Sequence, residues 1–227
     1  MIAVAVVAHM DRMDMVISLA DKVDPQYLLM DDGTKGCFLN HQRAWEKLTF
    51  SGAEWCVVLE DDALPVPCFR EQLAQALAVA PSPVVSLYLG TGRPKRVQPS
   101  IRAFVESGVE TCWLTSEHML HAVGIAMHRN VIAGMLTHIR QVPAALLPID
   151  RAIGHWVTHG GPGSVAYTWP SLVGHRDTPT VIEDHPSGES NRVMYLDEGD
   201  SLPVVTPRVA WRVGVRDRWD DSTHVLA

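Results

Sequence analysis

The sequence predicts an α/β protein with a central, mostly parallel sheet flanked by helices. Short apolar runs alternate with longer amphipathic segments, which is the pattern of successive strand and helix units. The 227 residues combine 47% hydrophobic with 20% charged residues, a mixture that can bury one core. The longest apolar run is the MIAVAVVA at residues 1–8, far short of the roughly 20 residues that a membrane helix needs.

Each element is assigned from its apolar spacing, in order along the chain. Strands are expected at about residues 2–8, 26–30, 55–59, 84–89, 121–127 and 164–168. Helices are expected at 38–49, 69–80, 130–142 and 148–159, where apolar residues recur at helical spacing. The Pro and Gly residues that follow the last two helices are typical helix ends.

The chain is predicted to form one domain, because no repeat of roughly 20 to 50 residues is visible. Residues 1–182 carry the strand and helix pattern. Residues 183–227 are expected to form a loop or lid and then a tail that packs on the same domain, since acidic residues, Pro and Gly collect in 183–200. For Trp211 and Trp219 in this tail, structural packing is the safer interpretation.

The cysteines and the sequence start predict a reduced, cytoplasmic protein. Cys37, Cys56, Cys68 and Cys112 match neither a zinc knuckle nor a C-x-x-C pair, and the chain does not begin like a signal peptide. The net charge of -7 disfavours a protein that coats nucleic acid through its whole surface. A local basic stretch remains, either for phosphate binding or as a solvated loop: Arg93, Lys95, Arg96 and Arg102.

The most informative segment is residues 55–65, a buried strand that ends in Glu60, Asp61 and Asp62. Open α/β sheets bind ligands at the carboxyl ends of their strands. Alternation along the strand predicts Glu60 and Asp62 on one side and Asp61 on the other. Three adjacent carboxylates favour a hard cation such as Mg²⁺ or Mn²⁺, although an acidic turn before the next helix would have the same sequence.

Two blocks resemble the signature of family 25 glycosyltransferases. Gly33, Gly36, Cys37, His41 and Trp45 fit a G-x-x-G-C-x-x-S-H-x-x-x-W block, with Asn40 in place of the usual Ser, and residues 59–62 fit the L-E-D-D strand end that follows it. Segments 86–90 and 124–129 resemble later steps of that family. The likeness spans about residues 1–185 and is most specific at 33–62. Segments 61–65, 86–94, 148–153 and 168–175 also resemble small glycosyltransferases of actinobacterial phages.

The resemblance implies a GT-A-like, Rossmann-related fold, a nucleotide-diphosphate sugar donor such as a UDP-sugar, and Mn²⁺ or Mg²⁺ at the diphosphate. Asp62 is then the first metal ligand, and Glu60 holds the ribose, the metal or a metal-bound water. Asp61 orients its neighbours. His175 is a further metal ligand with His185 in reserve, although His175 could equally be an ordinary polar residue at a strand end.

An inverting sugar transfer needs a carboxylate that takes the proton of the acceptor hydroxyl. Asp150, at the start of a late helix, is the candidate base, with a helix N-cap as the structural alternative. The donor is expected to meet His9, Asp11, Asp31, Asp32 and Arg93, although Asp31 and Asp32 could be turn residues. The pairs His118/His121 and His155/His159 have helical, zinc-like spacing, but each is expected to lack a third ligand nearby, and they are assigned structural roles.

The sequence therefore predicts a metal-dependent glycosyltransferase. The acceptor stays open among a saccharide, a hydroxymethylated base of phage DNA and a protein side chain. The alternative is a catalytically idle module that binds a sugar or nucleotide on the same fold.

Overall fold

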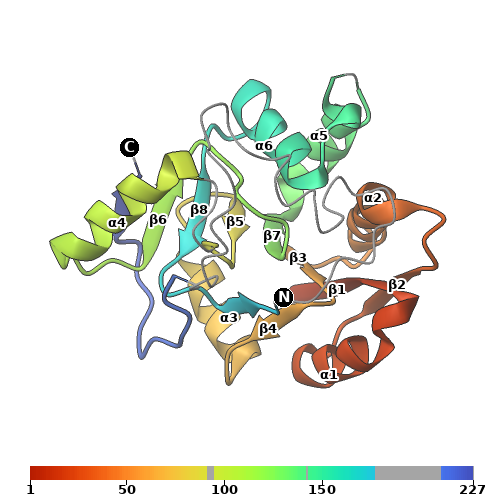
Figure 1. Ribbon diagram of the computed structural model, residues 1–227, viewed down its shortest axis with the longest axis horizontal. Helices are drawn as coiled ribbons and strands as arrows, with labels where there is room; N and C mark the ends of the chain where they lie inside the picture. The colour runs from red at the N-terminus through yellow and green to blue at the C-terminus, as the bar shows by residue number, and fades with distance from the viewer. Residues whose placement is uncertain (91–94, 142, 177–210, 227) are drawn as a thin grey trace.

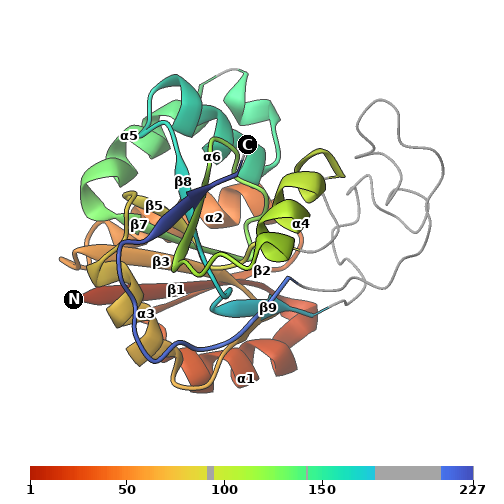
Figure 2. The ribbon, with the colours of Figure 1, turned by 90° about the vertical axis from the view of Figure 1, so that its left-hand side faces the viewer.

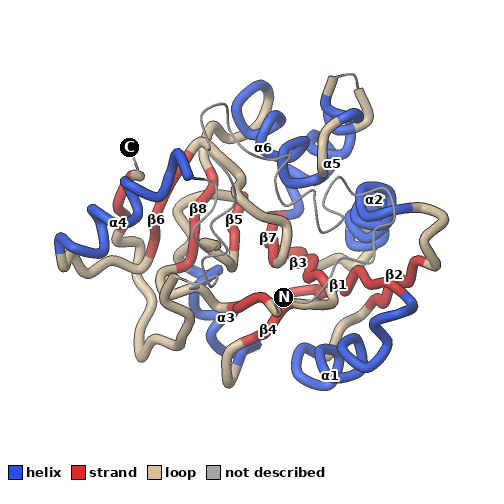
Figure 3. Tube along the Cα trace, viewed as in Figure 1, coloured by secondary structure: helices blue, strands red, loops and turns tan. Residues whose placement is uncertain are grey.

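The structure is a computed structural model that describes residues 1–90, 95–141, 143–176 and 211–226. It confirms the α/β prediction: a large sheet runs through the middle of the protein with helices on both faces (Figures 1 and 3). The eight strands of the large sheet follow the order β10-β6-β8-β5-β7-β3-β1-β2. Their bounds are β1 Ile2–His9, β2 Tyr27–Asp31, β3 Trp55–Glu60, β5 Val84–Ser86, β6 Trp113–Ser116, β7 Gly124–His128, β8 Val165–Thr168 and β10 Thr223–Val225.

Most strands of this sheet run the same way. β1 pairs in parallel with β2 and β3, and β5 pairs in parallel with β8. β7 lies antiparallel between β3 and β5, so those two strands point in the same direction. Only β6, β7 and β10 run the opposite way among the described strands. The carboxyl ends of β1, β2 and β3 therefore meet at one edge of the sheet.

The helices cover the two faces of the sheet (Figure 2). α1 (Met13–Val23) and α3 (Phe69–Ala78) share one core layer with Val4 and Val6 of β1. The other layer holds α2 (Gly36–Leu48), α4 (Gln98–Ser107), α5 (Arg129–Ile139) and α6 (Ile149–His159). The described residues also include three short 3-10 turns: η1 (Met10–Arg12), η2 (Lys95–Val97) and η3 (Ala144–Leu146).

Several elements differ from the sequence prediction. β5 stops at Ser86 because the Leu87 carbonyl accepts hydrogen bonds from the backbone N–H groups of Leu172 and Val173, which takes the chain out of the ladder. α1, α4, β6 and β10 were not predicted, and neither was the small antiparallel sheet of β4 (Ala63–Pro65) and β9 (Val173–His175). These strands have only three or four residues, which leaves too few positions for an alternating pattern to stand out.

Residues 211–226 pack against the body of the protein. β10 adds to the large sheet beside β6. The buried Trp219 donates from Nε1 to Gln72 Oε1 at 3.0 Å, and Arg216 Nη1 donates to the carbonyls of Thr111 at 2.8 Å and Trp169 at 3.0 Å. This arginine is therefore committed to the fold rather than to a polyanion. The predicted lid at 183–200 lies outside the described residues.

The four cysteines are free thiols, in keeping with the predicted reduced state. Within the described ranges, every helix is too short or too polar to cross a membrane.

Candidate functional site

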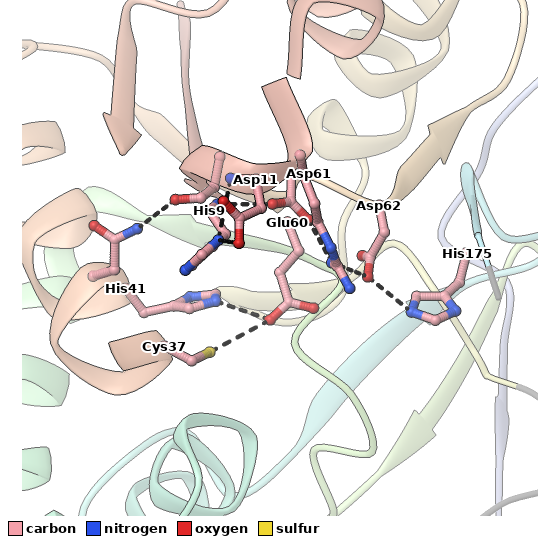
Figure 4. Close-up of polar contacts among 11 residues, drawn as sticks. His9, Asp11, Cys37, His41, Glu60, Asp61, Asp62 and His175 are labelled. Atoms are coloured by element: carbon pink, nitrogen blue, oxygen red, sulfur yellow. Dashed lines mark hydrogen bonds and ion pairs between the residues drawn. The ribbon is translucent and has the colours of Figure 1, made fainter. Parts of the chain in front are cut away.

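The site lies at the sheet edge where β1, β2 and β3 end (Figure 4). The parallel register places His9 opposite Asp31, and Glu60 opposite Val7 of β1. The ends of these strands carry polar side chains because the chain leaves the buried sheet there. His9, Asp31 and Glu60 are therefore brought to one edge, as the sequence predicted from the strand ends alone.

Arg12 holds both aspartates of the acidic triplet. Its Nη1 lies 2.8 Å from Asp61 Oδ1 and 3.1 Å from Asp62 Oδ2, and its side chain is only 12% exposed. Asp61 and Asp62 contact the same guanidinium, so the prediction that they face opposite sides is wrong. The cause is local: β3 ends at Glu60, and strand alternation does not extend into the turn at 61–62.

The environment shifts the pKa values of Asp61 and Asp62 in opposite directions. Burial raises the pKa of Asp61 despite hydrogen bonds from the His9 backbone N–H and from Arg12. Burial acts on Asp62 as well, but the hydrogen bond and charge of His175, together with Arg12, lower the pKa of Asp62 below its usual range. His175 and Arg12 thus favour the ionised form of Asp62.

Asp62 and His175 lie together although 113 positions separate them in the sequence. His175 Nε2 is 3.3 Å from Asp62 Oδ2, and the β4–β9 ladder that pairs Ala63 with His175 fixes this approach. The His175 ring also stacks on Tyr88, with ring centroids 6.0 Å apart. Asp62 Oδ1 is buried and has no hydrogen-bond partner among the described residues. An unpartnered carboxylate oxygen beside an imidazole fits a divalent cation such as Mn²⁺.

Glu60 belongs to a second group of side chains. Its Oε1 lies 3.1 Å from His41 Nε2 and 3.9 Å from Cys37 Sγ. Cys37 and His41 are four residues apart on α2 and so share one face of that helix. Burial, followed by the negative charge of Glu60, raises the pKa of the Cys37 thiol well above its usual value.

Asp150 lies in the first turn of α6, near this second group. Burial raises the pKa of Asp150 to about 6, and the charge of Glu60 contributes to the rise. The N-cap position of α6 is occupied by Pro148, while Asp150 Oδ1 accepts a hydrogen bond from the Arg151 backbone N–H at 2.8 Å. The alternative that Asp150 is the N-cap is therefore wrong. Its carboxyl group stands in a setting typical of a functional acid or base.

The remaining candidates have varied surroundings. Asp31 accepts hydrogen bonds from the backbone N–H groups of Lys35 and Gly36, at 3.1 and 2.7 Å, and so holds the start of α2. Asp32 accepts hydrogen bonds from Thr34, which lower its pKa, as in a turn. These contacts favour the turn alternative for both residues. Asp11 is exposed beside His9.

The basic stretch is only partly visible. Arg93 and the reserve ligand His185 lie outside the described residues. Arg96 and Arg102 are exposed on η2 and α4, so the second half of the predicted basic loop is helical.

One histidine pair has a neighbour that the sequence did not indicate. His138 Nε2 on α5 lies 2.8 Å from His155 Nδ1 on α6, and the ring of His155 stacks on that of His159. The expectation that no third imidazole lies near this pair is therefore wrong. His118 and His121 lie between β6 and β7 rather than on a helix.

An open pocket of about 580 Å³ lies on the α2 side of the site. Phe38 and Leu39 of α2 form one wall, and Leu146 and Pro148 form another. Because these walls adjoin Cys37 and Asp150 in the chain, a molecule in the pocket would lie beside the start of α6.

Residues 19–107 match the family model described as Glycosyltransferase family 25 (LPS biosynthesis protein). The matched segment is less than half of the chain, and it contains Cys37, His41 and the triplet at 60–62. Over this segment the chain is similar to that glycosyltransferase family. No curated protein sequence matches the chain.

Three solved structures are similar to this chain at low identity. A glycosyltransferase involved in the glycosylation of the major capsid of PBCV-1 is 11% identical over 78% of this chain and 94% of its own, with a TM-score of 0.38. Mannose-1-phosphate geranyltransferase from Thermus thermophilus is 13% identical over 74% and 73%, with a TM-score of 0.43. A protein from STIV is 12% identical over 81% and 98%, with a TM-score of 0.46.

Proposed function

We propose that this protein is a metal-dependent glycosyltransferase that moves a sugar from a nucleotide-diphosphate donor, such as a UDP-sugar, to an acceptor hydroxyl. One observation carries the proposal: the segment that matches the family contains Cys37, His41, Glu60 and Asp62, and the fold gathers these residues at the strand edge where α/β folds bind ligands. The free thiols fit a cytoplasmic setting, which would be the host cytoplasm for a phage protein.

In this proposal Asp62 and His175 hold Mn²⁺ or Mg²⁺, and Glu60 contacts the ion, a water bound to it or the donor ribose. A bound ion neutralises the charge that develops on the departing diphosphate. Asp61, fixed by the His9 backbone and Arg12, keeps Arg12 in place beside the donor phosphates. His9, Asp11 and Arg93 are proposed to border the donor, and Asp31 and Asp32 are proposed to hold the turn beside it.

Asp150 acts as the general base of an inverting transfer. A carboxyl with a pKa of about 6 is mostly ionised at neutral pH, yet it is a stronger base than an ordinary aspartate. It takes the proton of the acceptor hydroxyl while the hydroxyl oxygen bonds to the anomeric carbon of a hexose or pentose. The bond from that carbon to the diphosphate oxygen breaks, and the diphosphate leaves with the electron pair.

Three acceptor classes remain in the proposal: a saccharide, a protein side chain and a hydroxymethylated base of phage DNA. The exposed Arg96 and Arg102 support DNA as a candidate acceptor, because basic side chains bind backbone phosphates. The net charge of -7 restricts any such contact to this local stretch.

A specific contact favours a second candidate, a catalytically idle module that binds a sugar or nucleotide. Arg12 already pairs with both Asp61 and Asp62 and offsets part of their negative charge, so the site could bind a donor without a metal and without turnover. A panel of nucleotide sugars, incubated with and without Mn²⁺ and no acceptor, separates the two. Metal-dependent release of nucleoside diphosphate supports the enzyme, whereas binding without release supports the idle module.

A further inference from the structure

Cys37 and His41, which have no role in the proposed sugar transfer, form a cluster with Glu60. One ligand atom from each residue, a sulfur, an imidazole nitrogen and a carboxylate oxygen, lies within 4.8 Å of the other two. Figure 4 shows the three side chains pointing toward one another between α2 and the end of β3. They are separate from Asp62, whose contacts are with Arg12 and His175.

We propose that Cys37, His41 and Glu60 form a binding site for a borderline divalent cation of the zinc type, distinct from the Mn²⁺ or Mg²⁺ position at Asp62. Thiolate, imidazole and carboxylate are the ligands that Zn²⁺ prefers, whereas Mg²⁺ and Ca²⁺ take oxygen ligands. A cysteine is an unsuitable ligand for the ion expected at the diphosphate. The ligand set alone therefore assigns this site to a different metal.

Two separations within the cluster are close to those of tetrahedral coordination, and the third, between His41 and Cys37, is within 4.8 Å. With Zn–N and Zn–O bonds of about 2.1 Å and a Zn–S bond of about 2.3 Å, neighbouring ligand atoms are separated by roughly 3.4 to 3.6 Å. The observed separations are 3.1 Å from His41 Nε2 to Glu60 Oε1 and 3.9 Å from Cys37 Sγ to Glu60 Oε1. Small side-chain movements would thus complete three of four positions, and three protein ligands with one open position are typical of catalytic zinc sites.

The fold supports the site from two directions. The His41 side chain is fully buried, so the packing of α2 against the sheet holds its ring in place. The Glu60 side chain is 24% exposed, which gives an ion access to the cluster from solvent. A bound cation would fix the first turns of α2 to the end of β3. It would also offset the negative charge of Glu60 where Asp150 approaches it.

The test is a Co²⁺ titration of the reduced, metal-free protein, followed by absorption. We expect one thiolate-bound Co²⁺ per chain, seen as a cobalt–thiolate charge-transfer band that Zn²⁺ removes by displacement. Cys37→Ser should abolish the band, and His41→Ala and Glu60→Gln should each raise the Kd at least tenfold. Cys68→Ser, which removes an exposed thiol elsewhere, should leave both band and Kd unchanged.

The proposal is overturned if the wild type gives no band, or if the band survives in Cys37→Ser. It is also overturned if His41→Ala and Glu60→Gln both bind Co²⁺ as tightly as the wild type, because the band would then report a cysteine alone. Asp62→Asn should keep the band. None of these readouts uses sugar transfer, so the failure of one proposal does not decide the other.

Discussion

Replacing Asp150 with Asn should make the protein more stable at neutral pH. The folded state holds the Asp150 proton up to a pKa of about 6, whereas the ordinary value is 3.8. A carboxyl whose pKa rises on folding gives its full stability below the unfolded pKa and loses it as the pH rises through the folded pKa. The contribution of Asp150 to wild-type stability is therefore lost between about pH 4 and pH 6, and the Asn variant lacks this pH-dependent contribution.

The size of the effect follows from the shift. At 1.36 kcal/mol for each pKa unit, the ionised Asp150 destabilises the fold by at most about 3 kcal/mol at neutral pH. Because the side chain is half-buried, water offsets part of this, and about 1.5 kcal/mol is a realistic expectation. Near pH 4.5 the destabilisation by Asp150 is roughly a third of its value at neutral pH, because the unfolded carboxyl is already largely ionised there while the folded one is still protonated.

Urea unfolding of the wild type and Asp150→Asn at about pH 4.5 and pH 8 measures this difference. Asp32→Asn is the matched control, because hydrogen bonds from Thr34 lower the pKa of Asp32 and the sign of its contribution is reversed. That contribution is already present above the ordinary pKa of 3.8, so the Asp32 variant should differ from the wild type by nearly the same amount at pH 4.5 and pH 8. A difference between wild type and Asp150→Asn that does not change with pH would refute the burial argument. Asp150→Asn should also lower kcat roughly 10²- to 10⁴-fold, with little change in donor affinity.

Three other predictions concern the metal, the acceptor and the tail. Mn²⁺ with UDP should raise the Tm of the wild type, and Asp62→Asn should erase that rise in a thermal shift assay; an equal shift in the variant would remove Asp62 from the site. If DNA is the acceptor, the rate of transfer to a hydroxymethylated duplex should fall as the salt concentration rises, and a plot of log binding constant against log salt should have a slope of roughly -0.9 per phosphate contact. The double change Arg93→Glu and Arg96→Glu should weaken DNA binding and leave donor hydrolysis unchanged. Transfer that does not depend on salt would exclude this acceptor. Trp219→Ala should destabilise the fold by about 3 to 5 kcal/mol in urea unfolding, because it leaves a cavity and removes the hydrogen bond to Gln72; a loss under about 1 kcal/mol would mean that the tail adds little to the core.

The sequence was sufficient for the features that depend on local pattern. Apolar runs located β1, β2 and β3, and the acids at 60–62 marked the sheet edge where the site lies. The sequence could also have predicted α1, since its buried Val16, Leu19 and Val23 repeat at helical spacing. It was missed because it follows β1 after a turn of only three residues.

Other parts of the site depend on contacts between distant segments. Arg12 reaches Asp61 from 49 positions away, and no local pattern marks an arginine after a strand as the partner of a later carboxylate. The contact of Cys37 and His41 with Glu60 had a signal, because the two lie one helical turn apart in the block that resembles family 25. That spacing places them on one face of α2, but only the packing of α2 on the sheet shows that this face meets Glu60.

The central claim is that this site transfers a sugar to a hydroxyl, and mass spectrometry of the acceptor tests it most directly. The wild type is incubated with Mn²⁺, each nucleotide sugar and one member of each acceptor class: a saccharide, a hydroxymethylated DNA duplex and a protein. The account predicts that one class gains the mass of a single hexosyl or pentosyl residue, that the gain requires Mn²⁺, and that Asp150→Asn slows it roughly 10²- to 10⁴-fold. Donor binding without any mass gain across the whole panel would contradict the account and leave the idle binding module.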